Sequence, residues 1–309
     1  MNKLTIGIPT FNRFQDLKKT VNFFIEEGVL GNPDVEFLIS DNSSSDNTQD
    51  YLLELKESYN NIIINRNAFN IGAEGNFCRI IELSNSQYVW IVGDDDELQK
   101  GVVSRVISLL KKYNPSWLFI RHIFVQSDAK VIPSLDCDSF YSKGIDLFNL
   151  ICQSDYKLGG LMFVSSSVHL TKNARSAIDF FKGSSESKYN NMALTLGLAF
   201  NSAVHGSACI TDLEEIENNC YIGNWVSKII KVNCRDQIAI LDLFAKKNNV
   251  NLLKETKFED GLLYKCPEWV YFRSSFKETN VAMRYYLKHR PIKVIKDFFV
   301  LLFKRKRRD

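Results

Sequence analysis

Short apolar runs and helically spaced apolar residues alternate along the first 120 residues of the chain. The runs, rich in β-branched residues, cover residues 4–9, 35–40, 62–65 and 87–93, and another begins near 116. Between them, apolar residues recur every three or four positions over about 14–25, 48–59, 73–83 and 101–113. Runs of this kind predict buried strands, and the helical spacing predicts amphipathic helices. Strands separated by such helices are typical of an α/β fold, Rossmann-like, with a mixed, mainly parallel sheet and helices on both faces.

The pattern becomes less regular after residue 122. The segments IFVQ and AKVIP predict a hairpin, and LGGLMFVSS, residues 158–166, predicts another buried strand. Helical spacing returns over 188–200, 225–247 and 268–289. Neither an internal repeat nor a Pro/Gly/Ser-rich linker divides the chain. We therefore expect one α/β domain over residues 1–220 and a helical C-terminal region over 221–309.

Composition is that of an ordinary globular protein. Of the 309 residues, 45% are hydrophobic and 24% are charged, close to the average for such proteins. No apolar run reaches the roughly 18–20 residues that a membrane-spanning helix needs. The N-terminal segment has the pattern of a strand and not of a signal peptide. The seven cysteines are scattered without a CxxC pair, which favours free thiols in the cytoplasm over disulfides or a structural zinc site.

The charge is distributed unevenly. Residues 287–309 hold nine Lys or Arg and two Asp, a net charge of +7, so that the rest of the chain carries −4. Apolar residues recur at helical spacing in the same segment: Ile292, Ile295, Phe298, Phe299, Leu302 and Phe303. A basic amphipathic helix of this kind is suited to an anionic membrane surface. The alternative is a helix packed on the core. Nucleic acid is not an expected partner, because no aromatic and basic platform accompanies the basic residues.

The strongest chemical signal is GDDDEL, Gly93–Leu98, directly after an apolar strand. Three adjacent carboxylates repel one another, and at a buried strand end they are unfavourable unless a cation neutralises them. Carboxylate oxygens suit Mg²⁺ or Mn²⁺. Open α/β sheets bind ligands beyond the carboxyl ends of their strands. The motif therefore predicts a divalent metal site, and the alternative is an acidic turn that caps the next helix.

Polar residues also follow the first three strands. Thr10 and Asn12 offer hydrogen bonds to a nucleotide, and Arg13 can pair with phosphate. Asp41, at the end of the second strand, can accept hydrogen bonds from a ribose or base. Two glycines in residues 72–75 permit close backbone approach to a ligand. Neither a GxGxxG fingerprint nor a P-loop occurs, which disfavours dinucleotide oxidoreductases and P-loop ATPases.

Four motifs, IPTFNR, ISDNSSSDNT, NRNAFNIGAEGNF and VWIVGDDDEL, follow four successive strands in this order. In this combination residues 3–120 resemble the family 2 glycosyltransferases of the GT-A fold. Within that family the chain looks most like the bacterial surface-polysaccharide branch that includes abequosyltransferase-like enzymes. The resemblance implies a nucleotide-sugar donor (UDP, CDP or dTDP), a divalent metal on a DXD-type motif, and inversion at the anomeric carbon.

The resemblance also implies roles for single residues. The residues expected to bind the nucleotide sugar are Pro9, Thr10, Arg13, Asp41, Asn70, Gly72, Asp94 and Asp95. Asp41 would meet the base or ribose, and Asn70 and Gly72 would lie near the diphosphate. Asp94 and Asp95 would face the ribose and the donor sugar, which places Asp95 among the catalytic residues. Asp96 is the expected ligand of Mn²⁺ or Mg²⁺.

An inverting transfer needs a base for the acceptor hydroxyl. Many family members take it from a Glu-Asp pair well after the metal motif, and many processive members add QxxRW. This sequence has neither. Glu186, the sole acid of residues 181–192, is the predicted base, with Asp179 and the acidic residues of 212–217 as alternatives. The lack of QxxRW favours addition of a single sugar.

Together these expectations describe a metal-dependent inverting glycosyltransferase of bacterial surface polysaccharide synthesis. It would transfer one sugar to a glycan acceptor, lipid-linked in this interpretation, on the cytoplasmic face of the plasma membrane. One alternative is a sugar nucleotidyltransferase, which the lack of a Gly-rich basic N-terminal loop disfavours. The other is a non-catalytic nucleotide-sugar-binding or scaffold protein.

Overall fold

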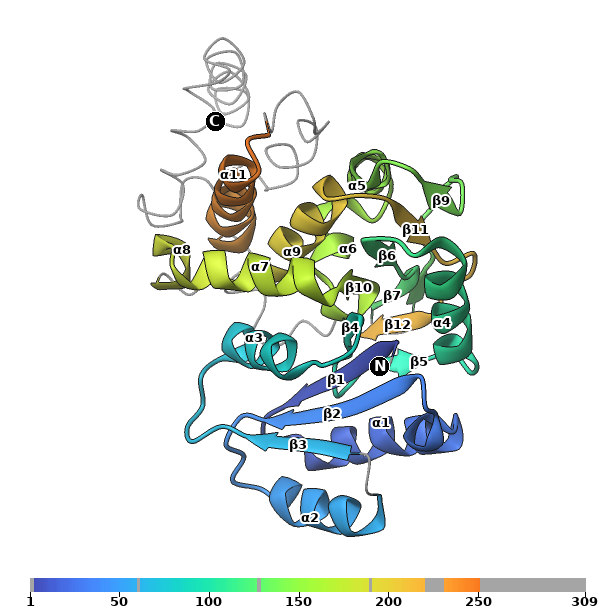
Figure 1. Ribbon diagram of the computed structural model, residues 1–309, viewed down its shortest axis with the longest axis vertical. Coiled ribbons are helices and arrows are strands. Elements are labelled where there is room, and N and C mark those ends of the chain that lie inside the picture. The colour runs from blue at the N-terminus through green and yellow to red at the C-terminus, as the bar shows by residue number, and fades with distance from the viewer. Residues whose placement is uncertain (1–2, 60–61, 127–128, 189–190, 220–230, 251–309) are drawn as a thin grey trace, which may run out of the picture.

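The computed structural model describes residues 3–250 except 60–61, 127–128, 189–190 and 220–230. Strands and helices alternate through its first part, as the sequence predicts (Figure 1). The elements are β1 (Leu4–Thr10), α1 (Phe14–Glu26), β2 (Val35–Asp41), α2 (Thr48–Ser58), β3 (Ile62–Arg66), α3 (Ala73–Leu83) and β4 (Tyr88–Ile91). A 3₁₀ turn, Val29–Gly31, lies between α1 and β2.

The remaining described elements are shorter and less regular in order. They are β5 (Glu97–Leu98), α4 (Val102–Tyr113), β6 (Trp117–Phe119), β7 (His122–Gln126), β8 (Ala129–Val131), β9 (Phe140–Tyr141), α5 (Gly144–Gln153), α6 (Lys157–Met162), β10 (Ser167–Leu170), α7 (Thr171–Lys182), α8 (Ser185–Lys188), α9 (Leu194–Val204), β11 (Ala208–Ile210), β12 (Ile216–Asn219) and α11 (Gln237–Lys247). A 3₁₀ turn, Val164–Ser166, precedes β10, and a π-helical turn, Val232–Asp236, precedes α11.

Eight strands form one mixed sheet in the order β3-β2-β1-β4-β10-β6-β11-β9. The first four run parallel to one another, whereas β10 is antiparallel to both β4 and β6. The predicted mixed, mainly parallel α/β sheet is therefore confirmed. Because β1 to β4 share one direction, their carboxyl ends, with the four motifs, meet at one edge.

Each face of the sheet carries its own apolar core. On one face α1, α2 and α4 form a core with Tyr88 and Trp90 of β4, and on the other α3, α5, α7, α9 and α11 form a core that includes Val89 and Ile91. Alternate residues of a strand point to opposite faces, so every residue of β4 is buried. Figure 1 shows α1 and α2 on one side of β1 to β3 and α3 on the other. The prediction of helices on both faces is confirmed.

Close packing of α3 on β1 depends on a glycine in the strand. A β-carbon built on Gly7 would lie 2.2 Å from Cγ2 of Ile80, which is fully buried. Any larger residue at this position would push α3 away from the sheet. The first residues of α3 follow Gly72, so this contact also holds the third polar turn at the sheet edge.

A second sheet, in the order β5-β12-β7-β8, borders the acidic motif. The hairpin of β7 and β8 confirms the one predicted from IFVQ and AKVIP. Strand β5 starts directly after Asp96 and pairs antiparallel with β12, with Leu98 opposite Ile216. The backbone N–H of Gln99 donates to the carbonyl of Glu215, 2.8 Å away. The segment after the acidic motif is therefore attached to the second sheet.

One predicted strand is wrong. Residues 158–166 form α6 and the 3₁₀ turn, and the strand begins only at Ser167. Apolar runs of this length do not distinguish a buried helix from a buried strand, and Gly159 and Gly160 give no helical signal.

The later helices correspond only in part to their predicted ranges. The range 188–200 is divided between α8 and α9, and α11 covers the end of 225–247. Helix α11 packs on α9 through Phe244, whose ring lies 2.5 Å from a β-carbon built on Gly197. The domain limit after residue 220, the helix over 268–289 and the basic tail over 287–309 lie outside the described residues, and they stay predictions.

Candidate active site

Strand register brings the predicted site residues together. Thr10 lies opposite Asp41 in the pairing of β1 with β2, and Asp41 lies opposite Arg66 in the pairing of β2 with β3. On the other side of β1, Gly7 pairs with Ile91 of β4. Continuing that register places Thr10 beside Asp94. Residues at or just beyond the ends of these four strands thus form one polar row along the carboxyl edge of the sheet.

Asp94 is buried and held from two sides. Its Oδ2 accepts a hydrogen bond from Thr10 Oγ1 at 2.7 Å, and its Oδ1 lies 3.1 Å from Arg13 Nη1. Its backbone carbonyl accepts from Thr20 Oγ1 at 2.9 Å. Burial raises the pKa of Asp94 to about 6, although the Thr10 hydrogen bond and the Arg13 charge act against this rise. Thr10 and Arg13 therefore favour the ionised form of the Asp94 carboxyl group.

Asp95 and Asp96 point to different partners. Asp95 is exposed, and its Oδ2 lies 2.5 Å from Arg13 Nη1. Asp96 is partly buried, and its Oδ2 accepts hydrogen bonds from Ser165 Oγ and from the backbone N–H of Gly93. Burial raises the pKa of Asp96 to about 7, with the negative charge of Asp95 acting in the same direction and the Ser165 hydrogen bond against it.

Both oxygens of Asp41 are engaged by the chain itself. The carboxylate is fully buried; Ser44 N donates to Oδ1 at 2.9 Å and Arg66 Nη1 donates to Oδ2 at 2.8 Å. Arg66 Nη2 also donates to the carbonyl of Ser44 at 3.0 Å. Asp41 therefore stabilises the turn after β2 and fixes a guanidinium at the sheet edge, in addition to its predicted contact with a base or ribose.

A network of side-chain amides holds the third turn. Asn42 Nδ2 donates to Asn70 Oδ1 at 2.8 Å, and the N–H groups of Ile71 and Gly72 donate to the side chains of Asn42 and Asn70 at 3.0 and 2.9 Å. Asn67 Nδ2 donates to Asn42 Oδ1 at 3.0 Å. Gly72 has φ of +80°, a conformation that favours glycine. Asn70 and Gly72 are thus placed at the edge where the resemblance expects the diphosphate.

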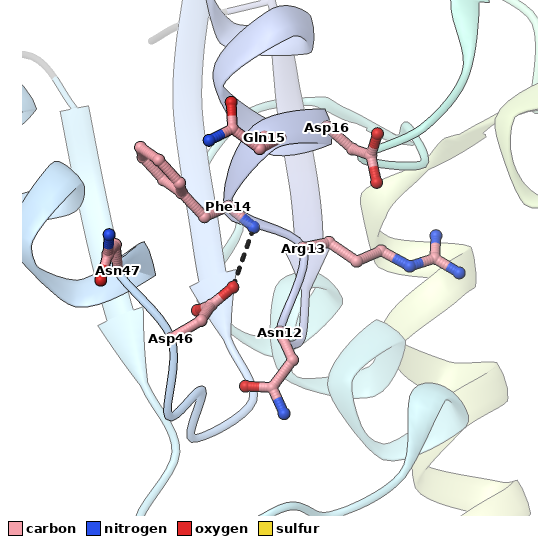
Figure 2. A pocket seen from close by; sticks show the side chains of 7 residues that line it. All are labelled: Asn12, Arg13, Phe14, Gln15, Asp16, Asp46 and Asn47. Atoms are coloured by element: carbon pink, nitrogen blue, oxygen red, sulfur yellow. Dashed lines mark hydrogen bonds between the residues drawn. The ribbon is translucent and has the colours of Figure 1, made fainter.

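The turn between β1 and α1 is fastened to the turn after β2. Asn12, with φ of +53°, donates its N–H to Ser44 Oγ at 2.9 Å and accepts from Ser45 N at 2.8 Å. Phe14 N donates to Asp46 Oδ2 at 3.0 Å (Figure 2). Asn12, Phe14 and Asp46 line a pocket at the start of α1, and Arg13 extends from the turn on the side away from Asp46 (Figure 2).

The acidic motif fits a divalent cation whose coordination shell would be completed by oxygens of the substrate. No three His, Cys, Asp or Glu side chains between residues 3 and 250, as far as these are described, converge to hold a metal by themselves. Mg²⁺ commonly takes one or two carboxylates and shares its remaining positions with phosphates and water. Asp96 supplies a hard oxygen ligand in surroundings that disfavour its uncompensated charge. The residues present therefore fit such an ion with Asp96 as its protein ligand.

Glu186 lies away from these contacts, in α8. Its Oε2 accepts from Asn191 Nδ2 at 2.9 Å and is 3.3 Å from Arg235 Nη2, so it links α8 to the segment before α9 and to the π-helical turn before α11. The alternative acids are also engaged or exposed. Glu215 is buried against Arg105, Glu214 and Glu217 pair with Arg121 and Lys130, and Asp179 is on the exposed face of α7. The base stays a prediction.

Sequence reasoning missed several residues of the site. The sequence does not indicate a site role for Ser165, because its apolar segment fits a buried strand and the residue lies in a 3₁₀ turn. Asn42 and Asn67 lie in or beside the quoted motifs, but their roles depend on contacts between turns that no local pattern specifies. Phe11 and Phe69 are 40% and 68% exposed in the turns after β1 and β3.

The arrangement of the sheet places the chain among the GT-A glycosyltransferase folds. A mannosyltransferase of Pyrobaculum calidifontis, PcManGT, solved with GDP-Man and Mn²⁺, superposes with a TM-score of 0.56 at 11% identity, over 97% of this chain and 85% of that one. Staphylococcus aureus TarS 1-349, solved with UDP-GlcNAc, gives 0.55 at 11% identity, over 91% and 79%. At such low identity these similarities support the fold alone.

The family follows from the sequence comparison. The profile of glycosyl transferase family 2 matches residues 5–164, about half of the chain, and the chain belongs to that family. It is 38% identical over 98 residues to abequosyltransferase RfbV of Salmonella typhimurium, covering 31% of this chain and 29% of that protein. A β-1,3-glucosyltransferase of Campylobacter jejuni that acts on GalNAc(5)-diNAcBac-PP-undecaprenol is 27% identical over 186 residues, covering 59% and 57%. In both cases the match spans less than two thirds of the relative.

Removing the partner of buried Asp41 should destabilise the protein. Arg66→Ala leaves a fully buried carboxylate with the Ser44 N–H alone, and we expect the free energy of unfolding to fall by about 1–3 kcal/mol. Urea unfolding measures the change. The control is Lys19→Ala, which breaks an ion pair with Glu97 whose side chains are 72% and 48% exposed and should change stability by no more than about 1 kcal/mol. Equal losses in the two variants would contradict the structural role of Asp41.

Proposed function

We propose that this chain is a metal-dependent inverting glycosyltransferase. It transfers one sugar from a nucleotide-sugar donor, with UDP, CDP or dTDP as the carrier, to a glycan acceptor of bacterial surface polysaccharide. The acidic motif carries the proposal, because Asp94, Asp95 and Asp96 follow the central strand β4 at the edge where the turns after β1, β2 and β3 also meet. The alternative of a sugar nucleotidyltransferase has no basic Gly-rich loop after β1 to support it. The other alternative, a non-catalytic binding protein, is tested by turnover itself.

The donor is bound along the polar row. Arg13 reaches Asp94 and Asp95 in this structure and has a guanidinium that can pair with phosphate. The amide-held turn of Asn70 and Gly72 presents backbone to the diphosphate, and Pro9, Thr10 and Asp41 complete the nucleotide side. Asp95, exposed beside them, faces the donor sugar. These residues mainly hold the donor in one orientation, which removes much of the entropic barrier to transfer.

A divalent cation fits at Asp96. When bound, Mn²⁺ or Mg²⁺ would neutralise charge that develops on the departing diphosphate. The chain itself supplies the carboxylate, holds it with Gly93 and Ser165, and keeps Asp94 close to Arg13. In this proposal Asp96 binds the cation, and Asp94 contacts the nucleotide.

The acceptor is proposed to be linked to lipid. The name of the Campylobacter jejuni relative includes an undecaprenol-linked glycan. This supports the proposal that the acceptor here is of the same class. Within the described residues there is no helix of the length and apolarity required to cross a bilayer. Residues 287–309, outside the described part, carry +7 and are proposed to bind an anionic membrane surface, with the enzyme on the cytoplasmic face of the plasma membrane.

The metal proposal predicts that Asp96→Ala abolishes turnover in a protein that stays folded. Hydrolysis of UDP-, CDP- and dTDP-sugars with Mn²⁺, with Mg²⁺ and with EDTA measures it. Glu97→Ala is the control, because Glu97 is the neighbouring carboxylate and is exposed. Full turnover in EDTA, or by the Asp96→Ala protein, would show that the enzyme needs no metal at this residue.

A base at Glu186 predicts that Glu186→Gln lowers kcat by ~10²–10⁴-fold. Glu57→Gln, which makes the same change at an exposed acid of α2, is the control. Because Glu186 is paired with Arg235, thermal unfolding is measured in parallel. A lowered melting temperature with unchanged kcat per folded molecule would assign Glu186 a structural role and move the search to Asp179 and the acidic residues of 212–217.

The membrane proposal predicts that deleting residues 291–309 releases the protein from anionic vesicles. Binding of the full chain should also weaken with salt, since the Debye length is about 10 Å at 0.1 M and shortens above it. Donor hydrolysis should persist, because the acidic motif lies far earlier in the sequence. Equal vesicle sedimentation of the full and shortened chains would refute the proposal, and loss of folding would favour a helix packed on the core.

A further inference from the structure

The acidic motif contacts Ser165, a residue far along the chain for which the sequence predicted no role. Ser165 lies in the 3₁₀ turn before β10 and is fully buried. Strand β10 runs antiparallel to β4, with Val168 opposite Trp90. Continuing that register beyond the paired residues brings Ser165 opposite Gly93, the first residue of the motif. The sheet therefore delivers this hydroxyl to the strand end from which the three carboxylates project.

Ser165 is fixed from behind and bonded to the motif in front. Its carbonyl accepts from Nε1 of the fully buried Trp90 at 2.8 Å, which holds the turn against β4. Its Oγ accepts from Gly93 N at 2.8 Å and donates to Asp96 Oδ2. A serine hydroxyl has one donor and can accept at the same time, so both capacities are used and the hydroxyl orientation is set.

The same oxygen of Asp96 takes both hydrogen bonds. Gly93 N donates to Oδ2 at 3.1 Å, in addition to the bond from Ser165. A β-carbon built on Gly93 would lie 2.5 Å from this Oδ2, so the lack of a side chain at 93 lets the carboxylate fold back onto the strand end. Two donors on Oδ2 fix the side-chain rotamer of Asp96 and direct its other oxygen away from them.

We propose that Ser165 is a positioning residue for divalent-cation binding, acting through Asp96. The proposal rests on the proposed metal-dependent function and adds a residue to it. Ser165 contributes no charge; it holds a ligand that would otherwise rotate, and neighbours that orient metal ligands commonly change metal affinity 10–100-fold when removed. The role is served by a single buried hydroxyl, so its loss can be tested with little change in volume.

The test is binding of Mn²⁺ alone, followed by electron paramagnetic resonance of the free ion. We expect Ser165→Ala to raise the Kd for Mn²⁺ about 10-fold or more, and Asp96→Ala to abolish binding at this site. The matched control is Ser166→Ala. Ser166 is equally buried, but its Oγ donates to the carbonyls of Gly160 and Phe163 at 3.0 and 2.7 Å, within its own segment. This variant should bind Mn²⁺ as the wild type does.

A kinetic readout separates positioning from a general loss of structure. With a hydrolysable nucleotide sugar, Ser165→Ala should raise the KM for Mn²⁺ while kcat at saturating Mn²⁺ stays near the wild-type value. Ser165→Cys, which keeps a weak donor in a similar volume, should lie between serine and alanine, and it carries the test if the alanine variant does not fold.

The possible failures are distinguishable. If Ser165→Ala and Ser165→Cys bind Mn²⁺ as tightly as the wild type while Asp96→Ala does not bind it, Ser165 has no positioning role and the proposed function stands. If Ser166→Ala weakens binding as much as Ser165→Ala, the effect is structural and the positioning role is overturned. If Asp96→Ala binds Mn²⁺ normally, the metal site itself is wrong and both proposals fail.

Discussion

The site is organised around the burial of carboxylates at the end of one central strand. Asp94 and Asp96 leave β4 in a protein interior that disfavours their charge, and burial raises the pKa of both. Each is met by hydrogen-bond donors from another segment. Thr10 and Arg13 come from the end of β1, and Ser165 comes from the turn before β10. Parallel pairing on one side of β4 and antiparallel pairing on the other supply these donors, so sheet topology and site chemistry form one arrangement.

Most of the fold was predictable from the sequence. Alternating strands and helices up to residue 120 follow from apolar spacing, since β1, β2 and β4 are buried on both faces and each helix on one. The segment around α6 was not predictable, because an apolar run containing two glycines fits a buried strand as well as a buried helix. Its actual state depends on packing against α5 and α9, which sequence spacing does not reveal.

The candidate site divides in the same way. Thr10, Asp41 and Asp94 could be placed together because they lie at or just after the ends of successive strands, and α/β sheets bind ligands beyond the carboxyl ends of their strands. Ser165 and the amide network of Asn42, Asn67 and Asn70 could not, because these contacts join turns far apart in sequence. Glu186 was proposed as the base from its position ahead of a helix, and in the structure it forms an ion pair with Arg235. A role as the base stays a prediction.

The acidic turn connects the two sheets, because it follows β4 of the large sheet and leads directly into the two-residue strand β5 of the small one. In the order β5-β12-β7-β8, the hairpin of β7 and β8 is separated from β5 by β12. Lengthening the hairpin tip would therefore leave the pairing of Leu98 with Ile216 unchanged, whereas an insertion next to Glu215, whose carboxylate is held by Arg105, would shift it. As related proteins diverge in sequence, we therefore expect insertions to be tolerated in the hairpin of β7 and β8. We expect none in β12, the strand that pairs with β5 beside the carboxylates.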